Sequence, residues 1–134
     1  MKDLDISKIS SILYPYFIFY IQSERWGTSI WITQREGKAF GRVYWYNDDN
    51  TIIYLDNLSV NKKERKQGIG TLLQVLREEI GRILKIPFSH LLVLRDSWMH
   101  DWYCRRGYSD YKEHDTDKDW VWMSKQIYIE VETK

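Results

Sequence analysis

The sequence has little cysteine, no long hydrophobic run and almost no net charge, and each shortage excludes a class of protein. The single cysteine, Cys104, permits neither an internal disulfide nor a cysteine zinc site. The aromatic-rich run from Leu13 to Ile21 is too short to span a bilayer and contains Pro15. It also lacks a basic leader and a small-residue cleavage site, so we expect no signal peptide and a cytoplasmic protein.

The formal net charge of +1 gives the molecule no general attraction for nucleic acid or for an anionic membrane. A basic cluster, Lys62, Lys63, Arg65 and Lys66, has no second basic stripe to accompany it. We interpret this cluster as a solvated or phosphate-facing loop rather than a nucleic-acid patch. Nucleic acid and membrane are therefore not expected as partners.

No metal site is predicted either. The three histidines show no metal-ligand spacing (His90, His100 and His114). The acidic loop from Asp115 to Asp119 resembles the start of a calcium loop, but Gln126 stands where a bidentate glutamate is required and the sixth position is not glycine. A solvated loop, or one that attracts a cationic acceptor, fits this composition better.

A length of 134 residues predicts a single domain, residues 1–134, with one core. Hydrophobic content of 43% and charged content of 29% are typical of an ordinary soluble protein. The aromatic share of 16%, with seven Trp and ten Tyr, is high. These rings either fill the core or line a pocket, and composition leaves both readings open.

The first half of the chain predicts a short helix followed by an antiparallel meander. Asp5 can cap a helix that runs to Leu13 with isoleucines on one face, and Pro15 ends it. Short loops join the runs that follow, as in successive hairpins. The predicted strands are Tyr16–Ile21, Thr28–Gln34, Ala39–Tyr46 and Ile52–Val60.

The last of these strands contains a break in its alternation. Ile53 and Leu55 are apolar at odd positions, whereas Leu58 and Val60 are apolar at even positions. One extra residue near Asp56 or Asn57 would bring both pairs onto one face, as a β-bulge does. The alternative is a strand buried on both faces without a bulge.

The middle of the chain predicts a βαβ unit. Apolar residues recur at intervals of three and four from Thr71 to Leu84, which indicates a helix, and Pro87 closes the segment. Leu91 to Leu94 is continuously apolar, as expected for a strand buried on both faces. This strand should lie parallel to Ile52–Val60 through a right-handed crossover.

A second helix and a hairpin are predicted to close the fold. Ser97 can cap a helix over Trp98–Arg106, with Gly107 at its C′ position. Cys104 in this helix is interpreted as packed rather than nucleophilic, although His100 lies one turn before it. Tyr108–Lys112 and Trp120–Ser124 form the predicted hairpin, and the alternating tail Ile127–Val131 predicts a further strand or an extension.

The stretch from Arg65 to Gly70 lies between a strand and the first turn of the long helix. Unpaired amides and the positive end of the helix dipole make such a loop an anion site, and glycine lets a ligand approach the backbone. The stretch has no Gly-Lys-Ser/Thr ending and only one Gly-x-Gly, so neither the triphosphate loop nor the dinucleotide fingerprint is present.

Two runs together resemble a known family. Arg65-Lys66-Gln67-Gly68-Ile69-Gly70, after a strand ending in Val60, is similar to the Arg/Gln-x-x-Gly-x-Gly/Ala coenzyme-A motif of the GNAT superfamily of N-acetyltransferases. Tyr103-Cys104-Arg105-Arg106-Gly107-Tyr108 is similar to the family's Tyr-x-x-x-Gly-Phe signature. The resemblance covers Thr51 to Ser124 and implies a GNAT-like mixed α/β fold, with acetyl-CoA as co-substrate and no metal.

The resemblance also implies how acetyl-CoA is held. Its pantetheine arm would pair with the bulged strand, which splays from the strand at Leu91–Leu94, and its pyrophosphate would rest on the loop amides. The implied cofactor-binding residues are Leu58, Ser59, Val60, Arg65, Lys66, Gln67, Gly68, Ile69, Gly70, Thr71 and Tyr103.

The family reaction is direct attack of a primary amine on the thioester. The resemblance places Tyr103 as the general acid that protonates the leaving thiolate, since a phenol is protonated at neutral pH. An amide near Leu58 would stabilise the oxyanion. Asp56 is the candidate base, with a bulge residue that bonds its own backbone as the alternative. Glu24, Asp101 and Glu113 stay open as bases.

Departures from the family pattern affect the acceptor side. Asp96 stands where many relatives have Asn, and Met99 replaces a usual Ala. The Ser23–Gly27 segment is too short for the helical insert that relatives carry, so the acceptor site is open or rebuilt from tryptophans and the acidic loop. Those tryptophans are Trp26, Trp31 and Trp45.

These departures leave two functions in view. One is an N-acetyltransferase acting on a small molecule or a peptide, and the other is a catalytically reduced acyl-CoA sensor or protein-interaction module. A homodimer through edge strands also stays open.

Overall fold

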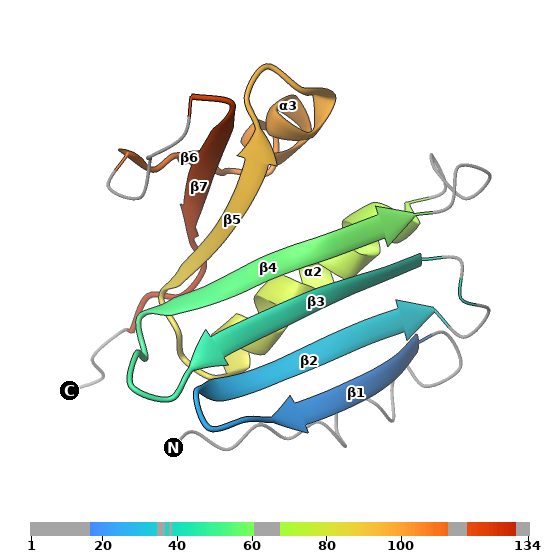
Figure 1. Cartoon of the computed structure of the whole chain (residues 1–134), viewed down its shortest axis with the longest axis vertical. Helices are drawn as coiled ribbons and strands as arrows, with labels where there is room; N and C mark the ends of the chain where they lie inside the picture. Colours follow the sequence, from blue (N-terminus) through green and yellow to red (C-terminus); the bar gives the residue numbers. More distant parts are fainter. Residues whose placement is uncertain (1–16, 35–36, 38, 61–67, 113–117, 131–134) are drawn as a thin grey trace.

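The computed structural model describes residues 17–34, 37, 39–60, 68–112 and 118–130. They form a seven-stranded mixed sheet in the order β1-β2-β3-β4-β5-β7-β6, with two described helices (Figure 1). The elements are β1 Phe17–Ser23, β2 Gly27–Gln34, β3 Ala39–Tyr46, β4 Ile52–Val60, α2 Ile69–Ile83, β5 Phe88–Leu94, α3 Trp98–Cys104, β6 Ser109–Asp110 and β7 Trp120–Gln126. The predicted helix Asp5–Leu13, the loop residues Arg65, Lys66 and Gln67, and Glu113 lie outside the described residues.

The antiparallel meander is confirmed. β1 to β4 are neighbours in chain order, and each pair is antiparallel. Strands β3 and β4 have the predicted bounds, and the ends of strands β1 and β2 differ from the predicted ends by one or two residues. Alternation places Ile30, Val43 and Ile53 in the buried core on the face that α2 covers.

The βαβ unit is also confirmed, but its two strands touch only briefly. β4 and β5 run parallel and pair only from Ile52 with Phe88 to Tyr54 with His90. On its other side β5 pairs with β7 along its whole length, from Phe88 to Leu94. Beyond Tyr54 the two parallel strands diverge (Figure 1). The prediction that Leu91–Leu94 is buried on both faces is wrong, because Leu92 and Leu94 are 43% and 47% exposed on the face away from α2.

Helix α2 buries a more polar face than its leucine pattern predicts. Leu73, Leu76 and Ile80 enter the core, but Leu72 and Ile83 of the apolar pattern are exposed. Their place is taken by three buried polar side chains that bond to one another or to neighbouring elements (Gln74, Arg77 and Glu78).

These buried polar groups join the helix to the C-terminal half of the sheet. Tyr108 Oη donates to Glu78 Oε2 at 3.2 Å and lies 2.6 Å from Ser89 Oγ. Burial, and next the charge of Glu78, raise the pKa of the Tyr108 hydroxyl. Lys125 Nζ contacts Glu78 Oε1 at 2.9 Å, so the carboxylate is paired.

The end of the fold is close to prediction with several differences, and β6 covers only Ser109–Asp110 of the predicted strand Tyr108–Lys112. Ser97 caps α3 by accepting the amide of His100, as predicted, but the helix ends at Cys104 rather than Arg106. β7 continues to Gln126, and residues 127–130 form no strand, because Ile127 turns inward and its amide donates to the Pro87 carbonyl. Cys104 is exposed rather than packed, with Sγ 3.8 Å from His100 Nδ1.

Candidate active site

The predicted bulge lies in β4. Phe40 pairs with Ser59 and Arg42 pairs with Asp56, so one residue of β3 faces two residues of β4. Asn57 has φ of 52°, the left-handed conformation that asparagine tolerates better than most residues. The bulge brings Leu58 and Val60 onto the core face with Ile53, which resolves the break in alternation.

The N-terminus of α2 faces this bulged strand. Gly68 caps the helix with φ of 82°, a conformation that favours glycine, and no described side chain caps the first amides. The first turn also carries no acidic residue. The amides and the positive end of the helix dipole are therefore available to an anion.

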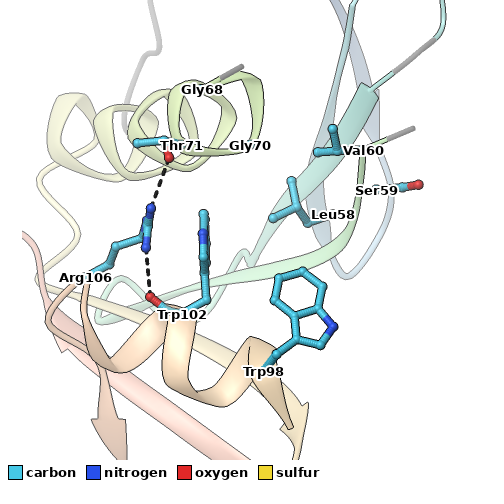
Figure 2. Close-up of a pocket in the computed structure, with 9 residues that line it drawn as sticks. All are labelled: Leu58, Ser59, Val60, Gly68, Gly70, Thr71, Trp98, Trp102 and Arg106. Atoms are coloured by element: carbon cyan, nitrogen blue, oxygen red, sulfur yellow. Dashed lines mark hydrogen bonds between the residues drawn. The ribbon is translucent and has the colours of Figure 1, made fainter. Parts of the chain in front are cut away.

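A pocket of about 650 Å³ lies between the bulged strand, the start of α2 and helix α3. This volume falls within the range of small-molecule sites. Figure 2 shows the side chains of Leu58 and Val60 on one wall and those of Trp98, Trp102 and Arg106 on the α3 side. Six predicted cofactor residues line it together: Leu58, Ser59, Val60, Gly68, Gly70 and Thr71.

Arg106 is a pocket residue that the sequence argument missed. Its guanidinium lies 3.6 Å from the centre of the Trp102 ring and donates to Thr71 Oγ1 at 3.0 Å and to the Trp102 carbonyl at 3.0 Å (Figure 2). Burial, and next the charge of Arg105, lower the pKa of the Arg106 guanidinium. The Nε of Arg106 has no partner among the described residues. The guanidinium places a positive charge at the first turn of α2.

Tyr103 lies beneath the pocket rather than on its wall. The side chain is 4% exposed, and its ring meets those of Trp102 and Tyr108 edge-on at 4.9 and 5.4 Å between centroids. Its hydroxyl accepts a hydrogen bond from Arg77 at 3.3 Å. Tyr103 is thus held at the inner side of α3, next to a residue that lines the pocket.

Asp56 is engaged in an ion pair. Arg42 Nε donates to Asp56 Oδ1 at 2.8 Å, and Arg42 NH2 donates to Oδ2 at 2.5 Å. This bidentate geometry is the strong form of the arginine–carboxylate pair, and it raises the pKa of Arg42. Each carboxylate oxygen accepts one hydrogen bond from Arg42, so a substrate proton could reach Asp56 only at the remaining lone pairs of these oxygens.

The sheet face away from α2 carries a row of aromatic rings. Tyr44 and Tyr54 are stacked with centroids 5.1 Å apart, Trp26 meets Tyr44 edge-on at 5.9 Å, and the Arg42 guanidinium lies 5.5 Å from the Trp31 ring. Burial raises the pKa of the Tyr44 hydroxyl to about 12. Trp45 packs against the core and does not belong to this row.

The remaining candidates are dispersed. Glu24, Asp96 and Asp101 are exposed and do not line the pocket. Asp96 has φ of 57° in the turn before α3. Within the described ranges, no three metal-ligating side chains gather, and no helix is long and apolar enough to cross a membrane.

The chain matches the model of the Acetyltransferase (GNAT) family over residues 6–108. No curated protein matches it. The ribosomal-protein-S18-alanine N-acetyltransferase of Escherichia coli has a TM-score of 0.62 and 14% identity, with 100% of this chain and 96% of that chain covered.

Two further solved structures are similar in fold. An N-acetyltransferase of Thermoplasma acidophilum named paia, solved in complex with coenzyme A, has a TM-score of 0.59 and 18% identity and covers 88% of this chain and 65% of its own. Nourseothricin acetyltransferase has a TM-score of 0.58 and 14% identity, with 83% of this chain and 84% of that chain covered. Such low identities show the fold alone. The family match over residues 6–108 goes further, and the chain belongs to the GNAT family of acetyltransferases.

Proposed function

We propose that the protein is an N-acetyltransferase that transfers an acetyl group from acetyl-CoA to a primary amine by direct attack in a ternary complex. The pocket between β4, α2 and α3 carries this proposal. Acetyl-CoA has a pyrophosphate that suits the helix amides and Arg106, and a pantetheine arm with amides that suit a strand edge. Acetyl-CoA thus matches both the positively charged wall at the start of α2 and the strand edge of β4.

The β4 edge supports the pantetheine part. β4 pairs with β5 only as far as Tyr54, so the edge from Leu58 to Val60 is not covered by β5. An extended arm that carries amides can add to such an edge as a further strand does. The amide of Leu58, next to the bulge, is then the candidate donor to the oxyanion that forms on the thioester.

The acid–base roles are those that the family resemblance implies for Tyr103 and Asp56. Tyr103 is proposed as the acid that protonates the departing thiolate, and it stands beside Trp102 of the pocket wall. Asp56 is proposed as the base, acting after its ion pair with Arg42 opens or through an intervening water. Replacement of Asp56 by Asn should then lower kcat and leave acetyl-CoA affinity intact.

The aromatic row supports a cationic acceptor, either a small molecule or a peptide. A guanidinium already rests 4.8 Å from the Tyr44 ring and 5.5 Å from the Trp31 ring, so this face accommodates a cation on its rings. A primary amine arrives mostly protonated at neutral pH and would be attracted in the same way. Trp26 and Tyr54 extend the row beyond these rings.

A second candidate function is an acyl-CoA-binding sensor or interaction module. The ion pair that occupies Asp56 is the observation that favours it. The test is release of CoA thiol from acetyl-CoA in the presence of a polyamine, an aminoglycoside, an amino acid or a peptide, with calorimetric binding of acetyl-CoA in parallel. Turnover supports the enzyme, binding without turnover supports the module, and a folded protein that does neither rejects both.

A further inference from the structure

Helix α2 carries an arginine whose side chain is completely buried. Arg77 is 0% exposed and projects inward with Leu73 and Ile80. The facing position on β3 is glycine, and a Cβ at Gly41 would lie 3.3 Å from Arg77 Cδ. The backbone of β3 therefore leaves room for this long side chain under the bulge.

The Arg77 guanidinium is held by neutral oxygens. NH1 donates to the carbonyls of Asp56 at 3.2 Å and Arg42 at 3.4 Å, and NH2 donates to Gln74 Oε1 at 2.6 Å and to Tyr103 Oη at 3.3 Å. Its Nε has no partner among the described residues.

The nearest buried carboxylate on the same helix is neutralised by other cations. Glu78 pairs with Lys125 at 2.9 Å and with Arg82 at 3.2 Å, and no described carboxylate forms an ion pair with Arg77. An unpaired buried charge is costly, so buried cations are normally paired. The Arg77 guanidinium thus lacks a carboxylate partner among the described residues, and a negative charge formed beside it would be stabilised.

This cation connects the two sides of the candidate active site. Through NH1 it meets β4 at Asp56, one residue before the bulge, and through NH2 it meets Tyr103 of α3. Arg77 occupies a lone pair of the tyrosine oxygen, and within the described residues no acceptor takes the hydroxyl's own proton. The hydroxyl proton therefore has no recorded acceptor among the described residues and can be donated to a ligand.

We propose that Arg77 positions the Tyr103 hydroxyl and stabilises the phenolate that remains after Tyr103 protonates the leaving thiolate. The inference rests on the proposed transferase function. The amine nitrogen forms a bond to the acetyl carbon, the carbon–sulfur bond breaks with its electron pair on sulfur, and the Tyr103 proton moves to sulfur. The phenolate beside Arg77 then recovers a proton from solvent, while the new amide loses one.

A positioning role is separable from a structural one by a double-mutant cycle. The variants are Arg77→Met, which removes the charge and keeps most of the volume, Tyr103→Phe, and the two combined. Thiol release from acetyl-CoA gives kcat with an amine that the wild type accepts, or with water where no amine is accepted. Calorimetry gives the affinity for acetyl-CoA, and a thermal melt checks folding.

Arg77→Met should lower kcat about ten- to hundredfold, less than the roughly hundred- to thousandfold lost with a direct oxyanion donor, because Arg77 acts through Tyr103. The affinity for acetyl-CoA should change less than about threefold. In the Tyr103→Phe background the same replacement should lower kcat less than about threefold, because the phenolate no longer forms. Arg77→Lys, which keeps the charge, should restore part of the rate, and it replaces Arg77→Met in the cycle should the methionine variant not fold.

Two kinds of failure are distinguishable. The role of Arg77 alone is overturned if the wild type releases thiol but the kcat losses of Arg77→Met and Tyr103→Phe multiply in the double variant. It is also overturned if the variants lose acetyl-CoA affinity in parallel with kcat. A folded wild type that neither binds nor cleaves acetyl-CoA overturns the proposed function, and the role of Arg77 with it.

Discussion

Replacement of Arg106 by Met tests whether the pocket binds the pyrophosphate of CoA. The methionine keeps the length of the aliphatic stem but removes the charge, the guanidinium that lies over the Trp102 ring and the hydrogen bond to Thr71 Oγ1. Arg106 stands at the first turn of α2, where the helix dipole and the amides also favour an anion. Its removal therefore leaves an anion site that is weaker but still formed.

The expected loss can be worked from this geometry. Two unit charges about 4 Å apart attract by about 4 kcal/mol at an effective dielectric constant of about 20, and a hydrogen bond to a charged group contributes about 1.5–3 kcal/mol net. Because the helix amides remain, we expect a loss of about 2 kcal/mol, or about thirtyfold in the dissociation constant of CoA. Lower salt should widen the difference.

The assay is calorimetric titration with CoA and with pantetheine, which lacks the pyrophosphate. Arg106→Met should weaken CoA binding and leave pantetheine binding unchanged. Arg105→Met is the matched control, because Arg105 is the exposed neighbour that does not line the pocket and its loss changes net charge equally. Equal losses in the two variants, or an equal loss for pantetheine, would refute the reasoning.

Two further predictions concern the scaffold. Gly27→Ala should destabilise the fold by about 1–3 kcal/mol in urea unfolding, because a Cβ at Gly27 would lie 2.0 Å from the Trp45 carbonyl oxygen; an unchanged midpoint would contradict that contact. Burial raises the pKa of Tyr44 to about 12, so the folded state keeps a proton that an unfolded tyrosine loses near pH 10, and stability should fall as pH rises from about 10 through 12. Tyr44→Phe should flatten part of this fall, and an identical pH dependence in the variant would refute the assignment.

The sequence was most informative where one physical constraint decided the structure. The reversed alternation between Leu55 and Leu58 left a choice between an extra residue and a strand buried on both faces, and the bulge at Asn57 supplies the extra residue. The glycine stretch before α2 predicted an open helix N-terminus, and Gly68 caps it with a positive φ. Both features depend on short-range backbone geometry, which neighbouring residues largely determine.

The sequence was least informative where two distant elements meet. Arg106 reaches the pocket only because α3 docks beside the start of α2, and its signal in the sequence was limited to a basic pair before Gly107. Arg77 is buried because glycine faces it on β3 and Tyr103 approaches from α3, which helical periodicity does not reveal. The exposure of Leu92 likewise depends on the divergence of β5 from β4.

The most direct test of the central claim is calorimetric titration of the wild type and of Gly70→Asp with acetyl-CoA. A Cβ at Gly70 would make only ordinary contacts, 3.5 Å to Val60 Cγ2 and 4.0 Å to Trp102 Cζ2, and an acidic residue suits the first turn of a helix, so the variant should fold. The proposed pyrophosphate site predicts saturable binding to the wild type and a loss of at least about a hundredfold in the variant, since the new carboxylate would repel the phosphates by about 3 kcal/mol at 5 Å. A folded wild type that does not bind, or a variant that binds equally well, would contradict the claim that this pocket holds acyl-CoA.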